Sequence, residues 1–467
     1  MRLSLILLFA VLPTATPLVA QPAPSNELEQ LARDILEEMV GINTAHSEGS
    51  TLELARAMER RFLAAGFPRE DVEVTQVAER EGNVLVRLRG RSQDRKPIMA
   101  MAHIDVVEAD PEDWTLPPFE LIEQDGTFYG RGVADDKDEA AAYAAIMIRM
   151  KQEGFTPDRD IVVALTADEE GGGHNGIAWL LANRPEWMDV AYALNEGGGG
   201  VVVDGRKIAN SVQASEKKFL NFTVEATNPG GHSSRPRPDN AIYELSKALT
   251  RIGEYRFPVN LNEVTTAFFT RSADFQDDPR MADAMGRLVA DQADQDAVRT
   301  LEFDSRYNAM MRTTCVATLL EGGHASNALP QRATANVNCR ILPDESPEDV
   351  LAQLRRAVGD AEGVVVTMDG NATNSPPSPL TPEVLAPVDA LTEEMWPGVP
   401  VVPTMSTGAT DALYLRNAGI PVYGVSGMFF GDSFAHGMNE RIPVQAFYEG
   451  VAFLDRLVRT LSSRSVS

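Results

Sequence analysis

DIVVALTADEE, residues 160–170, joins an apolar run to three consecutive acidic residues, Asp168, Glu169 and Glu170. The apolar part is typical of a strand buried inside a sheet, and glycines follow the acids. Repulsion among like charges and their removal from water both oppose such a cluster at the end of a buried strand. The stretch therefore predicts either a solvated turn or a positively charged partner.

Apolar strands and helical segments alternate on both sides of this stretch. NVLVRLRG and PIMAMAHID precede it as expected strands, and DVAYALNEGGG follows it as another. KDEAAAYAAIMIRMKQEG and HNGIAWLLAN have the pattern of helices, and near the C-terminus PVVPTM and TDALYLRNAG continue the alternation. This order favours an α/β fold with a mostly parallel central sheet flanked by helices.

The order of elements changes in the middle of the chain. From KFLNFTVEAT to GVVVTMDG the segments follow the order of a ferredoxin-like βαββαβ unit. A largely helical insertion, 255–311, separates the first helix of this unit from its second strand. We therefore expect one α/β domain in two parts, 26–212 and 373–467, interrupted by a smaller domain at 213–372.

The composition is that of an acidic globular protein. The chain has 467 residues, more than one ordinary domain core, and 42 Lys and Arg against 68 Asp and Glu give a formal net charge of −26. Such a surface repels nucleic acid and anionic membranes, so neither is an expected partner. The charge itself is most simply a source of solubility.

Residues 1–20 have the features of a secretory signal peptide. Arg2 supplies a positive start, and the apolar run from Leu3 to Leu12 is too short to span a bilayer comfortably. Small residues then lead to a cleavage site near Ala20. An uncleaved anchor is the alternative. We expect a periplasmic or secreted protein.

Only two cysteines occur, Cys315 and Cys339, in the expected strands TTCVATLL and TANVNCRIL. A hairpin centred on Asn327 would place them opposite each other. In an oxidising compartment they would then form a cross-strand disulfide. The alternative is a pair of small buried side chains.

Polar side chains gather where expected strands end. In open α/β sheets the carboxyl ends of strands are where ligands bind. Histidine nitrogen and carboxylate oxygen suit zinc, although manganese or cobalt also fits. The residues that combine these ligand types at strand ends or in nearby loops are His103, Asp135, Glu170, Glu196 and His436.

A charge count favours two metal ions. The five ligands carry a charge of about −3, and two divalent cations would offset it with room for one hydroxide. A single cation would leave the carboxylates poorly compensated. One carboxylate would then bridge the two metals.

Five motifs in order resemble the two-zinc metallopeptidase family of glutamate carboxypeptidase, carboxypeptidase S, aminoacylase, acetylornithine deacetylase and succinyl-diaminopimelate desuccinylase. The motifs are AHIDVV, GRGVADDKD, DEEGG, GGHSS and HGMNE, and the similarity spans nearly the whole mature chain. Asp138 stands where the family commonly has glycine. The stretch from Trp114 to Phe119 and the NEGG at Glu196 are closest to the carboxypeptidase S and aminoacylase branch.

The resemblance implies a zinc-peptidase-like catalytic domain whose inserted unit is a lid and dimerisation domain. It also implies two Zn²⁺ per subunit. Asp135 would bridge them, possibly next to a cis peptide with Asp136. One site would be completed by His103 and Glu196, and the other by Glu170 and His436.

The same resemblance assigns the remaining roles. Asp105 would hold the ring of His103, and Glu169 would be the general base. If the strand continues through DEE, Glu169 and Glu170 point to opposite faces, with Glu170 against a metal and Glu169 toward the water. His232, from the inserted domain of the partner subunit of a homodimer, would stabilise the oxyanion. The substrate carboxylate would be held by Asn327, Arg340 and the backbone around Gly408.

These roles predict an exported dinuclear-zinc hydrolase that cleaves an amide bond beside a free carboxylate, as a carboxypeptidase or an N-acyl amino acid amidohydrolase. Three alternatives stay open: a binding protein that kept the fold, a zinc aminopeptidase or dipeptidase, and amide synthesis by the reverse reaction. A binding protein is disfavoured because every expected metal-ligand position holds a suitable residue. The large insertion between Glu196 and His436 argues against a single-domain aminopeptidase.

Overall fold

The computed structural model describes residues 26–92, 94–171 and 173–463. The expected signal peptide, 1–20, lies outside these ranges. Among the described helices, none is both long enough and apolar enough to cross a bilayer.

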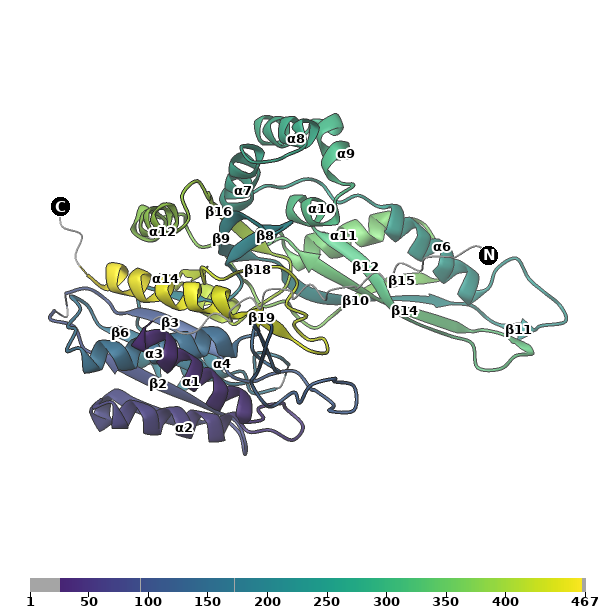
Figure 1. Cartoon of the computed structure of the whole chain (residues 1–467). Coiled ribbons are helices and arrows are strands. Elements are labelled where there is room, and N and C mark those ends of the chain that lie inside the picture. Colours follow the sequence, from purple (N-terminus) through teal and green to yellow (C-terminus); the bar gives the residue numbers. More distant parts are fainter. Residues whose placement is uncertain (1–25, 93, 172, 464–467) are drawn as a thin grey trace, which may run out of the picture.

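A ten-stranded sheet forms the centre of the larger part of the molecule (Figure 1). Its strands are β1 (Val72–Gln76), β2 (Gly82–Leu88), β3 (Ile98–His103), β6 (Ile161–Thr166), β7 (Tyr192–Asn195), β8 (Gly200–Val203), β9 (Arg206–Glu216), β16 (Val401–Ser406), β17 (Val422–Gly424) and β18 (Phe429–Phe430). They follow the order β1-β2-β6-β3-β7-β17-β9-β8-β18, with β16 paired to β9.

The predicted α/β class is confirmed, and the sheet is mixed. Neighbouring strands from β6 through β3 and β7 to β17 are parallel. Antiparallel pairs join β1 to β2, β2 to β6, β17 to β9 and β9 to β8. The hairpin β8–β9 is not among the elements expected from the sequence, because β8 is only four residues long and β9 lacks a regular alternation of polar and apolar residues.

Helices cover both faces of the sheet because successive strand residues point to opposite sides. In β3, Ile98, Ala100 and Ala102 join one apolar cluster, whereas Met99 and Met101 join the other. The first cluster is covered by α1 (Glu27–Gly41), α2 (Thr51–Ala64), α3 (Lys137–Gln152), α12 (Pro382–Met395) and α14 (Val444–Ser462). The second is covered by α4 (Gly176–Asn183), α5 (Pro185–Met188) and α13 (Ala412–Asn417).

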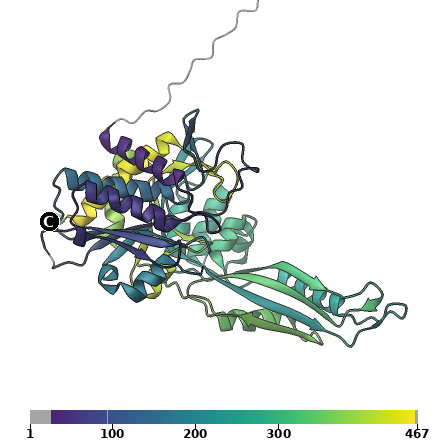
Figure 2. The same ribbon diagram turned by 90° about the horizontal axis from the view of Figure 1, so that it is seen from below.

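A second sheet extends away from the first (Figure 2). It contains β10 (Lys218–Thr227), β12 (Thr314–Gly322), β14 (Arg332–Ile341) and β15 (Val364–Asp369), and its helices are α6 (Ala241–Glu254) and α11 (Pro347–Val358). The strands are antiparallel in the order β12-β14-β10-β15, and they have their own apolar cluster. The βαββαβ order expected from the sequence is therefore present.

The two cysteines lie opposite each other in this sheet. Cys315 of β12 is paired in register with Cys339 of β14, and the two form a disulfide. Of the two alternatives that the sequence left open, the structure contains the disulfide.

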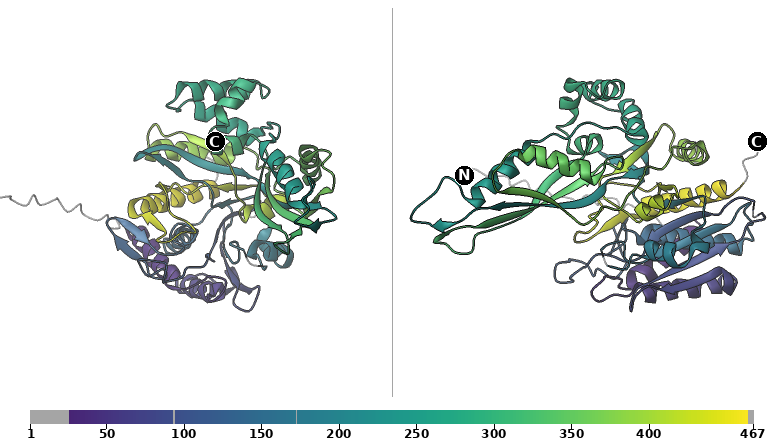
Figure 3. Two further views of the ribbon diagram at one scale, coloured as in Figure 1. Left: turned by 90° about the vertical axis from the view of Figure 1, so that its right-hand side faces the viewer. Right: turned by 180° about the vertical axis from the view of Figure 1, so that it is seen from behind.

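The helices of the insertion pack on the large sheet, whereas Phe257, near its start, belongs to the apolar cluster of the second sheet. These helices are α7 (Glu263–Ala273), α8 (Pro279–Ala290), α9 (Gln295–Leu301) and α10 (Ser305–Met311). Their apolar residues form one cluster with Ala209 of β9 and with Val402 and Met405 of β16. Figure 3 shows these helices beside that end of the sheet.

Short elements complete the described chain. They are the 3₁₀ helix η1 (Arg69–Asp71), a sheet of β4 (Ile122–Gln124), β5 (Thr127–Tyr129) and β19 (Arg441–Pro443), and the pair β11 (Gly231–His232) and β13 (Ala328–Leu329). The β11–β13 pair lies at the outer end of the second sheet (Figure 1).

Candidate metal centre

Three neighbouring parallel strands bring ligand residues to one edge of the large sheet. His103 is the last residue of β3, Glu196 directly follows β7, and Glu170 lies in the loop after β6. Because the three strands are parallel neighbours, their carboxyl ends meet at the same edge. Asp135, just before α3, and His436, in the loop before β19, complete the group.

The five predicted ligands form two triplets that share one carboxylate. One triplet is His103, Asp135 and Glu196, and the other is Asp135, Glu170 and His436. In each, the candidate ligand atoms lie within 4.8 Å of one another. Asp135 Oδ1 lies 3.0 Å from His103 Nε2, and Asp135 Oδ2 lies 3.2 Å from His436 Nε2. The shared residue thus offers one oxygen to each triplet, and Asp135 precedes a cis peptide bond.

The electrostatics of the centre favour a cationic occupant. Burial raises the pKa of Glu196 well above its ordinary value, and burial together with Asp135 raises that of Glu170 to about 6. Burial also opposes ionisation of Asp135, but hydrogen bonds from His103 and His436 outweigh it and lower its pKa. The donor set is imidazole nitrogen and carboxylate oxygen, which fits divalent metal ions such as zinc.

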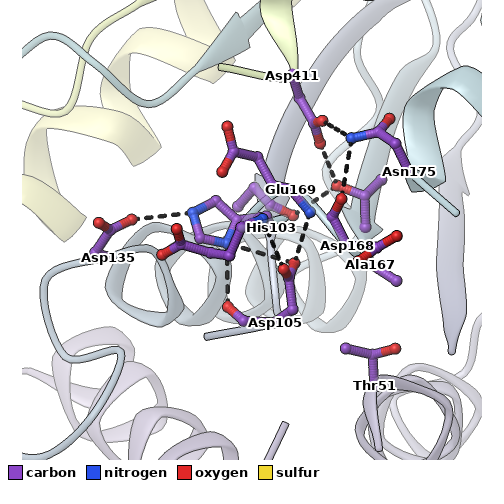
Figure 4. Close-up of polar contacts among 12 residues, drawn as sticks. Thr51, His103, Asp105, Asp135, Ala167, Asp168, Glu169, Asn175 and Asp411 are labelled. Carbon is purple, nitrogen blue, oxygen red and sulfur yellow. Dashed lines mark hydrogen bonds and ion pairs between the residues drawn. The ribbon is translucent and has the colours of Figure 1, made fainter. Parts of the chain in front are cut away.

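The acidic loop after β6 is held by Asp105. Its Oδ1 accepts the backbone N–H of Glu169 at 3.2 Å, and its Oδ2 accepts that of Glu170 at 2.9 Å. His103 Nδ1 lies 3.1 Å from the main-chain oxygen of Asp105 and 3.6 Å from Oδ1 (Figure 4). Asp105 therefore contacts the histidine ring through its backbone and the loop through its carboxylate.

One expectation about this loop is wrong. The strand β6 ends at Thr166, so Asp168, Glu169 and Glu170 do not continue it. Asp168 has a φ of 66°, which turns the chain. Strand alternation therefore does not separate the roles of the two glutamates. The loop conformation does so, fixed by the two hydrogen bonds to Asp105.

Glu169 lies among other acids at the edge of the centre. Partial burial, with the negative charges of Glu196 and Asp411, raises its pKa to about 9. Asp411 accepts hydrogen bonds from Asn175 Nδ2 at 2.6 Å and Thr166 Oγ1 at 3.0 Å (Figure 4). Without a bound cation, the carboxyl group of Glu169 therefore stays protonated at neutral pH.

A buried ion pair that the sequence did not reveal supports Asp135. Glu440 Oε2 accepts from Arg131 Nη1 at 2.7 Å, and its carboxylate also accepts the backbone N–H groups of Gly132 and Ala134. These partners immediately precede Asp135. The HGMNE and GRGVADD motifs are therefore joined through Glu440. In the sequence, Arg131 and Glu440 stood inside these two motifs as charged residues without an assigned role.

A third group lies behind the acidic loop. His46 Nδ1 lies 3.3 Å from Glu81 Oε1 and 4.0 Å from Asp168 Oδ1. These residues line a cavity that also includes Asp105 and Glu170. The motifs of the sequence assign no role to these three residues.

The predicted substrate-binding residues lie on separate elements of the chain. Exposed His232 lies in β11, where the backbone oxygen of Asn327 accepts the N–H of Ser233 at 3.1 Å. Arg340 lies in β14 with its guanidinium 4.9 Å from the ring of Phe219. Gly408 follows β16, and its N–H donates to Ser406 Oγ at 3.0 Å.

Linked histidine–carboxylate triplets at the strand ends of an α/β sheet are typical of metal-dependent hydrolases. The chain belongs to Peptidase family M20/M25/M40, whose model matches residues 99–460. The resemblance drawn from the five motifs is thereby confirmed.

Individual relatives agree with this family. N-fatty-acyl-amino acid synthase/hydrolase PM20D1 of Homo sapiens is 28% identical over 388 residues, which cover 80% of this chain and 76% of the relative. Aminoacylase-1A of Rattus norvegicus is 28% identical over 377 residues, covering 78% and 80%. The solved structure of the M20 family metallo-carboxypeptidase Sso-CP2 from Sulfolobus solfataricus has the same fold, with a TM-score of 0.69 at 18% identity over 92% of this chain and 99% of that one.

Proposed function

We propose that this protein hydrolyses an amide bond beside a free carboxylate, in N-acyl amino acids or short peptides, as a dinuclear zinc enzyme. The observation that carries the proposal is the position of Asp135, which presents one oxygen to His103 and the other to His436. A single carboxylate shared by two ligand triplets is typical of two-metal hydrolases.

His103, Asp135 and Glu196 would hold one cation, and Asp135, Glu170 and His436 the other. Two bound cations would polarise the amide carbonyl and make water more acidic. Zinc is favoured because both triplets combine imidazole with carboxylate, and manganese or cobalt would also fit.

Glu169 would act as the general base. Its carboxylate would accept a proton from the attacking water and later deliver it to the leaving amine, so that one group serves both steps. Bound cations would lower the high pKa of Glu169 by offsetting the charges around it. Asp105 would fix the Glu169 and Glu170 backbone, and hence both side chains, at the reaction site.

The substrate carboxylate would be bound by Arg340, Asn327 and the amides around Gly408, and His232 would come from a partner subunit. The exposed position of His232 at the end of the second sheet supports this division. The edge strand β12 exposes Val316, Leu319 and Leu320, which suits a contact between two copies in a homodimer.

Export to the periplasm or the exterior is supported by the Cys315–Cys339 disulfide, because such bonds persist in oxidising compartments. It agrees with the signal peptide expected at residues 1–20.

The proposal is tested with zinc-loaded protein on a panel of N-acyl amino acids and dipeptides, with release of the free amino acid measured by chromatography. We expect turnover of at least one class, absent from a Glu169→Gln control. Protein that binds two zinc ions per chain and cleaves neither class would contradict the proposal.

A further inference from the structure

A third histidine–carboxylate group lies beside the acidic loop and belongs to neither triplet of the metal centre. It consists of His46, Glu81 and Asp168, whose candidate ligand atoms lie within 4.8 Å of one another. The three residues line a cavity of about 180 Å³. Of the five predicted ligands of the metal centre, only Glu170 also lines this cavity. The group is therefore a separate candidate site.

The spacing of the three ligand atoms is close to the spacing around one small cation. His46 Nδ1 lies 3.3 Å from Glu81 Oε1 and 4.0 Å from Asp168 Oδ1. Ligand atoms around a tetrahedral zinc ion lie roughly 3.4 Å apart, because the bonds are about 2.0–2.2 Å long. The His46 side chain is 64% exposed, so a small movement of its ring would bring the three atoms to this spacing.

Contacts with the backbone hold this group in place. Asp168 is buried, and its Oδ2 accepts the backbone N–H of His174, while Oδ1 is the oxygen nearer to His46. Arg80 Nη2 donates to the backbone oxygens of His46 and Ser47 at 3.0 and 2.8 Å. The nearby arginine therefore fixes the histidine loop through neutral carbonyl groups and leaves the carboxylates of the group to another cation.

Two buried oxygen atoms at the cavity have no hydrogen-bond partner among the described residues. Thr44 lines the cavity and is 2% exposed, and its Oγ1 is one of these atoms. The other is Oε2 of Glu81, whose pKa is raised by burial and by the negative charge of Asp168. Buried oxygen atoms are costly to leave unpaired, and a carboxylate more so than a hydroxyl. A positive ligand in this cavity would relieve both costs.

We propose that His46, Glu81 and Asp168 bind a further divalent cation, Zn²⁺ or Mn²⁺. One imidazole with two carboxylates suits these ions. The bound ion would hold Asp168, and with it the loop that carries the proposed base and one ligand of the metal centre. The inference concerns metal binding and loop order, so it does not depend on which amide the protein cleaves.

The experiment counts zinc ions per chain by mass spectrometry after dialysis against zinc buffered with a chelator. Glu81→Gln removes one ligand charge, and His46→Gln removes the imidazole, so a folding failure of one variant leaves the other. His324→Gln, at an exposed loop position after β12, is the matched control. Hydrogen exchange of the backbone amides of 167–171 is a second readout that needs no turnover.

We expect three zinc ions in the parent protein and in the control, and two in each of the other variants. The amides of 167–171 should exchange faster in those two variants. An equal zinc count in all four proteins would overturn the site, because the additional ion would then be absent or bound elsewhere.

A variant of the metal centre separates this inference from the proposed function. Asp135→Ala removes the carboxylate shared by both triplets, so it should keep one zinc ion, and Asp135→Ala combined with Glu81→Gln should keep none. If the parent binds two ions and cleaves amides, the additional site is refuted and the proposed function stands. If Asp135→Ala keeps its one ion and the parent cleaves no amide, the reverse holds.

Discussion

The carboxylate of Asp105 accepts the backbone N–H of Glu170, with 2.9 Å between Oδ2 and the nitrogen. Its other oxygen accepts the N–H of Glu169 at 3.2 Å. One buried side chain on the loop after β3 thus fixes both acidic residues after β6, the expected ligand and the expected base. Three of the predictions below concern the groups joined by this contact.

Asp105→Asn should loosen the loop after β6 and weaken the metal site that contains Glu170. An amide has one oxygen acceptor in place of two, so one N–H loses its partner at a cost of about 1–3 kcal/mol. Zinc affinity should fall about 10–100-fold, as for other residues that support ligands. Zinc titration with a competing chelator measures it. Asp113→Asn, at an exposed position nearby, should bind zinc as the parent does.

Glu169→Gln should retain both metal ions and lose about 10²–10⁴-fold in kcat, since it removes the proton acceptor and no ligand. Metal content by mass spectrometry and single-turnover kinetics separate the two effects. A variant with full activity would show that another group accepts the proton.

The metal-free protein should lose stability as the pH rises from about 5 to about 9. Glu169 and His436 have pKa values raised to about 9, and Glu170 to about 6, above their ordinary values of 4.5 for Glu and 6.5 for His. A group whose pKa is higher in the folded than in the unfolded state stabilises the fold fully at pH values below its unfolded-state pKa. This stabilisation is lost as the pH rises through its folded-state pKa.

Zinc needs the deprotonated ligands, so the difference in melting temperature between zinc-loaded and chelator-treated protein should widen over the same range. Thermal denaturation at pH 5.5, 7 and 8.5 measures it. The lowered pKa of Asp135 acts in the opposite sense, but only in acid below this window. A constant or narrowing difference would contradict the assignment of these residues as metal ligands.

Glu440→Gln should destabilise the fold by about 3–5 kcal/mol, because it leaves the Arg131 charge buried without its counter-ion. The two side chains are 1% and 2% exposed. Urea denaturation gives the free energy of unfolding. Glu394→Gln, which breaks the surface pair with Arg456, should change it by less than about 1 kcal/mol. Equal effects of the two substitutions would show that Glu440 supports no buried charge.

Mixed dimers should reveal whether His232 serves the site of the other subunit. Glu169→Gln and His232→Ala proteins, each inactive alone, would form heterodimers with one intact site. Random mixing after unfolding and refolding should restore roughly one quarter of the parent activity. No recovery, with dimers demonstrated by light scattering, would place His232 at the site of its own chain or outside catalysis.

The sequence by itself determined the α/β class, the βαββαβ order and the residues that now form the two triplets. Each depends on local information. The periodicity of apolar residues distinguishes strands from helices. The ligand residues follow predicted strand ends, and parallel pairing brings these ends to the same edge of the sheet. The prediction that strand alternation places Glu169 and Glu170 on opposite faces was wrong because β6 ends at Thr166, before both residues. Where a strand ends depends on its pairing with neighbouring strands, so the boundary is hard to predict from the sequence.

Only the tertiary structure decided which distant residues meet. Glu440 joins Arg131 across the chain, the carboxylate of Asp105 turns to the loop after β6, and the helices of the insertion pack on β16. None of these contacts leaves a periodic or local trace, because a buried charge or an apolar helix face is compatible with many partners. The choice among them is made by the packing of the whole chain.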